Sequence, residues 1–146
     1  MFARLRINTL HSCPTSFVRR LNLHTYSTMA SSSPSPVKYQ LSFVVPPANL
    51  EACKAAIFAA GAGSYPGQGN YTECCWTITH GGLGQFRPGS GANPHIGTVG
   101  ALEYVEEARV ETMCVGEDVA RAAVAALKKA HPYEEVAYSV VKMEDF

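Results

Sequence analysis

Residues 102–141 read LEYVEEARVETMCVGEDVARAAVAALKKAHPYEEVAYSVV, and this stretch decides the fold. Charged side chains alternate with small or apolar ones in its first part, which predicts a strand over 102–115 with one charged face. Acids at the start of 117–130 and two lysines in its last turn suit the two ends of a helix dipole, and an apolar stripe lies between them. Pro132 limits this helix, and renewed alternation predicts a strand over 136–140. The stretch is therefore expected to fold as strand, helix and strand.

The preceding part of the chain has the same order of elements. Apolar and polar residues alternate over 39–45, and a helical pattern with Asn49 as its N-cap then continues to Gly61. A second alternating run, 71–80, predicts the next strand. Two strand-helix-strand units predict an α+β, ferredoxin-like βαββαβ domain, in which a four-stranded antiparallel sheet carries two helices on one side.

The other side of this sheet is expected to be uncovered. It would carry Glu73, Glu107, Arg109 and Glu111 beside apolar side chains. Large mixed patches of this kind often mark contacts between subunits, so we expect a homo-oligomer.

Residues 1–37 differ in composition from the rest of the chain. They contain four arginines, many hydroxyl residues and no acid, as mitochondrial transit peptides do, and Ser31–Pro36 is of low complexity. We expect this extension to be disordered, the folded domain to occupy 38–146, and the protein to be mitochondrial. Initiation at Met29 would instead leave the domain in the cytoplasm.

Length and charge exclude several classes of protein. A chain of 146 residues with 47% hydrophobic content suits one globular domain, and no apolar run approaches the ~18 residues that cross a bilayer. Residues 51–146 hold 7 basic and 12 acidic side chains, a net charge of −5, which argues against nucleic-acid binding. We therefore expect neither a membrane nor a nucleic acid as a partner.

A Gly-rich stretch, GGLGQFRPGSGANPHIGTVG, occupies residues 81–100 between the two units. A connection this long in a compact domain is usually functional, and its prolines indicate a folded platform. Arg87 within it could bind a carboxylate or phosphate together with glycine N–H groups, or could pair with Glu103 or Glu106 and hold the loop shut. The spacings of the GxGxxG and Walker motifs are absent from the stretch.

A second cluster, HPYEE at residues 131–135, gathers an imidazole, a phenol and two carboxylates where the second helix ends. These groups suit proton transfer or, with a further histidine brought in by folding, a divalent cation. A histidine at a helix C-terminus is equally explained by the helix dipole. We expect any ligand site to lie where the Gly-rich stretch meets this cluster. The candidate ligand-binding residues are Arg87, Asn93, His131, Tyr133, Glu134 and Glu135, and the candidate metal ligands are His80, His95 and His131.

Three segments of the chain resemble one known family. They are FRPGSGANPHIGTVGALE at residues 86–103, VEEARVET after it, and ALKKAHPYEEVAY further on. Together they closely resemble the PII/CutA-like domain inserted in YqfO-type members of the Nif-three-like (NGG-interacting factor) family, over about residues 38–142. The resemblance implies a ferredoxin-like domain that assembles through sheet edges and loops, as a trimer or a dimer. The motif residues that it carries over are Phe86, Arg87, Pro88, Gly91, Asn93, Pro94, Gly97, His131, Pro132, Tyr133, Glu134 and Glu135.

The resemblance also bears on function. In full-length members two larger lobes flank this domain and hold a two-metal site, and some members carry a GTP-cyclohydrolase-type name. No residue of this chain matches those metal ligands, so a stand-alone domain is expected. The sequence thus favours a non-catalytic oligomeric module, with a small anionic ligand or a divalent metal ion as its candidate ligand. The alternatives are a metal-dependent hydrolase that uses His131 and Glu134, and a protein-interaction module.

Overall fold

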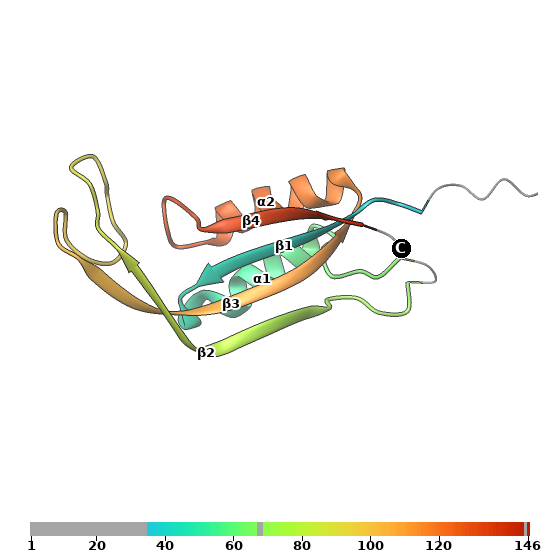
Figure 1. Cartoon of the computed structure of the whole chain (residues 1–146), viewed down its shortest axis with the longest axis horizontal. Coiled ribbons are helices and arrows are strands. Elements are labelled where there is room, and N and C mark those ends of the chain that lie inside the picture. The colour runs from blue at the N-terminus through green and yellow to red at the C-terminus, as the bar shows by residue number, and fades with distance from the viewer. Residues whose placement is uncertain (1–34, 67–68, 145) are drawn as a thin grey trace, which may run out of the picture. The chain divides into compact units, whose positions relative to one another are not determined.

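The computed structural model describes residues 35–66, 69–144 and 146, which belong to one compact unit. The predicted extension 1–37 lies almost entirely outside these residues, as does Met29. The elements in chain order are β1 (Lys38–Val45), a 3-10 turn (Pro47–Asn49), α1 (Leu50–Ala59), β2 (Cys75–Phe86), β3 (Glu103–Val115), α2 (Glu117–Ala130) and β4 (Tyr138–Met143), as labelled in Figure 1.

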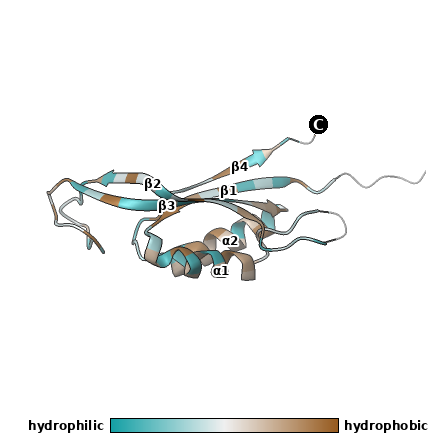
Figure 2. Cartoon of the chain, turned by 90° about the horizontal axis from the view of Figure 1, so that it is seen from below, coloured by the Kyte–Doolittle hydropathy of each residue, from teal (hydrophilic) through white to brown (hydrophobic). Residues whose placement is uncertain are grey.

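The four strands form one sheet in the order β2-β3-β1-β4, and each neighbouring pair is antiparallel. Both helices lie on the same face of this sheet, and the other face is bare (Figure 2). The predicted α+β, ferredoxin-like βαββαβ fold is therefore confirmed. We call the bare side, which carries Val44, Arg109 and Val141, the open face.

The core lies between the helices and the face of the sheet that they cover. Strand residues point alternately to the two faces, so every second residue of β1 and β3 enters the core. Each large apolar side chain buried in this way contributes about 1.5–3 kcal/mol. The fully buried residues include Leu41, Phe43 and Val45 of β1, Cys53 and Ile57 of α1, Ala108, Val110 and Cys114 of β3, and Ala123 and Leu127 of α2.

The ends of α2 follow the prediction from charge. Glu117 and Asp118 lie in its first turn and two lysines in its last, and Arg121 pairs with Glu117 one turn away. At α1, Asn49 occupies the predicted N-cap position, but its side chain makes no capping hydrogen bond. Neither helix of the described part of the chain is long and apolar enough to span a bilayer.

β2 differs most from the sequence prediction. It begins at Cys75 rather than at residue 71, and it continues to Phe86 through the first glycines of the Gly-rich stretch. Glycine weakens a strand locally, but the pairing of residues 82–86 with residues 103–107 of β3 outweighs this propensity. An irregularity in the pairing between Ile78 and Gly82 marks a β-bulge.

The long pairing of β2 with β3 creates a projection from the domain. β1 ends at Val45, which pairs with Ala108, so residues 82–86 and 103–107 extend beyond the other strands. Figure 1 shows them as a two-stranded ribbon with a long loop at its end. We call this ribbon and its loop, residues 82–107, the arm.

Candidate functional site

The loop of the arm is closed by contacts between its two ends. Arg87 donates a hydrogen bond of 2.6 Å from Nη1 to the carbonyl oxygen of Gly100, whose own N–H donates to the Pro88 carbonyl at 2.8 Å. Arg87 thus holds the loop shut through a backbone carbonyl, and neither Glu103 nor Glu106 is its partner. Glu103 instead accepts a hydrogen bond of 3.3 Å from the N–H of Thr98.

The loop of the arm meets the segment between α2 and β4, as expected from the sequence. The N–H of Asn93 donates to Oε1 of Glu134 at 3.0 Å, across 41 positions of sequence. The ring of Tyr133 lies among three others, with centroid distances of 6.4 Å to Phe86, 6.2 Å to His95 and 4.9 Å to His131. Candidate residues from both segments therefore come together in one aromatic cluster.

His131 is buried and uses both ring nitrogens within the fold. Its Nε2 lies 3.0 Å from the carbonyl oxygen of Val44, and its Nδ1 lies 3.1 Å from the backbone N of Tyr133. A carbonyl only accepts and an N–H only donates, so the ring is the neutral tautomer with its proton on Nε2. Burial lowers the pKa of His131, because the charged form would lose its hydration, although the hydrogen bond to Val44 opposes this effect.

Tyr133 and Glu107 are half-buried and form a second polar unit beside His131. The Tyr133 hydroxyl is shielded from solvent and makes no hydrogen bond of good geometry. Its burial, followed by the nearby Glu107 carboxylate, raises the pKa of Tyr133 to about 12. Burial also raises the pKa of Glu107, while the Tyr133 hydroxyl beside it acts in the opposite direction. Glu107 is not among the site residues predicted from the sequence.

None of the three candidate metal ligands belongs to a group of three or more metal-binding side chains among the described residues. His80 is exposed and lies 3.7 Å from Glu106, while His95 packs beside Tyr133 and His131 is engaged as described above. Residues 35–66 and 69–144 contain no group of three or more His, Cys, Asp and Glu side chains arranged to hold a metal ion. Glu135, the remaining candidate of this cluster, is exposed.

The pairing of β2 with β3 decides which side chains lie on the open face. Trp76 pairs with Glu111 and Ile78 with Arg109, so the two apolar residues share this face with the two charged ones. Glu73 was expected there, but it precedes β2. The expectation was wrong because both sides of the run 71–80 carry apolar residues, and alternation alone did not show which side faces the core.

The open face combines satisfied charges with bare apolar side chains. Glu111 accepts hydrogen bonds of 2.9 Å from Nε of Arg109 and from Nε2 of Gln40, so these polar groups are paired along the surface. Trp76 is 60% exposed and Val141 is 56% exposed. Ile78 and Met143 are also exposed on this face, which extends from β2 to β4.

Comparison with known proteins gives relatives for this domain, although no family model matches the chain. The GTP cyclohydrolase 1 type 2 homolog of Mycobacterium leprae is 46% identical over 97 residues, which cover 66% of this chain and 23% of that protein. The Bacillus subtilis protein of the same name is 40% identical over 124 residues, 85% of this chain and 31% of that protein. A crystal structure of a Bacillus cereus protein related to NIF3 aligns with a TM-score of 0.63 and 34% identity, over 77% of this chain and 27% of that one. The chain therefore contains a counterpart of one domain of these Nif-three-like proteins.

The Nif-three-like domain spans only about a quarter to a third of the length of these relatives. The match therefore identifies a domain. Its fold also occurs alone, because CutA from Xylella fastidiosa aligns with a TM-score of 0.51 over 75% of this chain and 86% of that one. At 15% sequence identity, this likeness to CutA shows the fold alone.

Proposed function

We propose that this Nif-three-like domain is a non-catalytic module that associates with copies of itself, as a trimer or a dimer, through the open face. The observation that supports this function is the set of exposed apolar side chains on the bare side of the sheet: Trp76, Ile78, Val141 and Met143. Trp76 and Ile78 lie on β2 and Val141 and Met143 on β4, with charged groups of β3 between them, and a large mixed patch of this kind often marks a contact between subunits. Covering it with a second copy would remove it from water.

The magnitude of this effect is large enough to drive assembly. Full burial of one large apolar side chain contributes about 1.5–3 kcal/mol, and these four side chains are 40–60% exposed, so covering each of them supplies roughly half of that value. The Arg109–Glu111–Gln40 network lies among these side chains with its hydrogen bonds already formed. Its burial would therefore leave few polar groups without partners.

Trp76→Glu is the variant that tests this proposal. The full chain should sediment as an oligomer, and the substitution should weaken association roughly 10- to 100-fold, because it removes an apolar contact and places a charge in the interface. Ala122→Glu is the matched control, since it adds the same charge at an exposed position of α2 in the opposite layer. Trp76 is the single tryptophan of the chain, so its fluorescence emission should also shift to shorter wavelength as protein concentration rises. A monomeric wild type, or equal loss of association in both variants, would refute the open face as the contact.

A small anionic ligand remains our proposal for the arm. Arg87 is exposed and uses one donor for the Gly100 carbonyl, which leaves further N–H groups of its guanidinium for a carboxylate or phosphate. A divalent metal is less well supported, because the nitrogens of His131 are both engaged. Thermal unfolding of the full chain with a panel of nucleotides, phosphate and divalent metals tests both ligands, with Arg87→Leu as the variant that should remove stabilisation by an anion.

The hydrolase alternative takes its support from the name of the relatives, GTP cyclohydrolase 1 type 2 homolog. It requires His131 and Glu134 to hold a metal. Nδ1 of His131, however, accepts a hydrogen bond from the N–H of Tyr133, and Oε1 of Glu134 accepts one from the N–H of Asn93. Metal analysis of the purified protein separates the two functions. A divalent ion retained by the wild type and lost by His131→Ala would favour the hydrolase over the non-catalytic module.

A further inference from the structure

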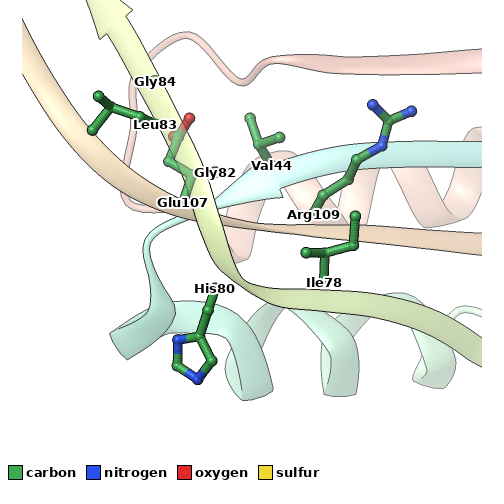
Figure 3. Close-up of a pocket in the computed structure, with 8 residues that line it drawn as sticks. All are labelled: Val44, Ile78, His80, Gly82, Leu83, Gly84, Glu107 and Arg109. Atoms are coloured by element: carbon green, nitrogen blue, oxygen red, sulfur yellow. The ribbon is translucent and has the colours of Figure 1, made fainter.

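A pocket of about 370 Å³ opens on the sheet where the arm joins the domain (Figure 3). The apolar side chains of Val44 of β1 and Ile78 of β2 lie on the same face as this pocket. The pocket lies at the small end of the range for ligand sites, which is about 300–1,000 Å³. It is formed by one copy of the chain and therefore exists without assembly.

Glu107 supplies the carboxylate of this pocket. Figure 3 shows its side chain rising beside Gly82 and Gly84, on the same side of the sheet as Arg109, while the ring of His80 lies apart. A Cβ at Gly84 would lie 2.5 Å from Oε2 of Glu107, so the missing side chain makes room for the carboxylate. The oxygen thus rests against the backbone of β2, partly withdrawn from solvent.

The described residues provide no cation for this carboxylate. Arg109 is the nearest candidate along β3, but its Nε and Nη2 both lie 2.9 Å from Oε1 of Glu111. His80 lies 3.7 Å from Glu106. Glu107 takes part in neither pair, and the charge of Arg109 is balanced by Glu111. Within the described part of the chain, the Glu107 carboxylate therefore has the Tyr133 hydroxyl beside it and no cationic partner.

We propose that this pocket binds a small organic cation with an apolar stem, of which an alkylguanidinium is the best fit. A guanidinium offers a planar fork of donors that matches both oxygens of a carboxylate. It is also more weakly hydrated than an ammonium, so its transfer into a half-buried pocket costs less. The alkyl stem would lie against Val44 and Ile78, which are half-buried and exposed, respectively, in a single copy of the chain.

Butylguanidinium is the probe, and butylurea is its neutral counterpart of nearly the same shape. The full-length chain is titrated with each, and binding is followed through the backbone amide resonances of Gly82 and Gly84. Butylguanidinium should shift both resonances in a saturable way, and butylurea should bind at least about tenfold more weakly.

Glu107→Gln should bind butylguanidinium about tenfold or more weakly than the wild type does, because it removes the charge and keeps the shape of the side chain. Glu106→Gln is the control, since it removes the same charge from the neighbouring residue on the opposite face of β3, and it should leave affinity within about twofold. Gly84→Ala is a second test that changes no charge. Its methyl group would displace the Glu107 carboxylate, and it should weaken butylguanidinium binding while the protein remains folded.

Equal affinity for the cation and the urea would overturn the proposal, as would unchanged affinity in Glu107→Gln. Binding of butylguanidinium by Trp76→Glu but not by the wild type would overturn the proposal as well. In that case the pocket of the wild type would be filled by a neighbouring copy, and the open face would be purely a subunit contact.

Discussion

Replacement of His131 by alanine should destabilise the domain through backbone groups that lie far apart in the sequence. The ring bridges the Val44 carbonyl at the end of β1 and the N–H of Tyr133 after α2, over distances of 3.0 and 3.1 Å. Without it both backbone groups would be left without partners in a largely buried place, and each such group costs about 1–3 kcal/mol. We expect His131→Ala to lower the free energy of unfolding by about 2–4 kcal/mol, measured by urea denaturation of the full chain near neutral pH.

The same contacts predict a dependence of stability on pH. Burial lowers the pKa of His131 below its ordinary value of 6.5, so the unfolded chain takes up the proton first as pH falls. The stabilisation is complete above pH 6.5 and is lost as pH falls toward the lowered native value, with a slope of up to about 1.4 kcal/mol per pH unit.

The assay compares urea midpoints and m-values between about pH 7.5 and pH 5.5, a range in which histidine titrates. His131→Gln should lose the slope that His131 contributes, while His95→Gln, which changes an exposed histidine, should retain it. Equal slopes in wild type and His131→Gln would show that the imidazole is not held neutral by the fold, and would refute the assignment of its tautomer.

Two further predictions concern the connections of the domain. Glu134→Ala removes the acceptor of the Asn93 N–H and should raise the amide hydrogen-exchange rate of Asn93. The free energy of global unfolding should change by no more than about 1 kcal/mol, because the contact is exposed. Unchanged exchange at Asn93 would contradict that contact. Gly63→Ala should cost about 1–3 kcal/mol in urea denaturation, because Gly63 has a φ of +77° and a Cβ there would lie 2.7 Å from the backbone N of Cys74. Gly89→Ala is the control, because a Cβ there has open space around it, and it should leave the free energy of unfolding nearly unchanged.

Periodicity was sufficient to predict most of the fold. The alternation in 39–45 and 107–114 sorted buried from exposed residues correctly in both strands, because each has one clearly polar side. The same reasoning failed for β2, where both sides carry apolar groups and where glycines interrupt the pattern. Pairing with β3 is a contact between segments distant in sequence, so no local pattern of 71–86 contains it.

The contact between the Gly-rich stretch and residues 131–135 was predicted, but the bonds that form it were not. The meeting of the Gly-rich stretch with residues 131–135 was expected, and the Asn93–Glu134 hydrogen bond and the rings around Tyr133 show that contact. The hydrogen-bond partner of His131 is a backbone carbonyl 87 positions away. Every residue has such a carbonyl, so the sequence does not indicate which one His131 contacts. Glu107 was assigned to a charged strand face, and only the space left by Gly84, diagonally across the pairing, reveals that its carboxylate lies against β2.

The placement of the ends of the domain fits its role as one part of longer relatives. Lys38 pairs with Met143, so the first and last strands begin and end side by side. A domain with neighbouring ends can be inserted into a longer chain with little distortion of either part, and the relatives are three to four times longer than the matched region. The arm lies at the opposite end of β1, beyond Val45. Flanking parts joined at Lys38 and Met143, as in the relatives, would lie at the end of the sheet opposite the arm, whose loop contacts Tyr133 and Glu134 of its own domain.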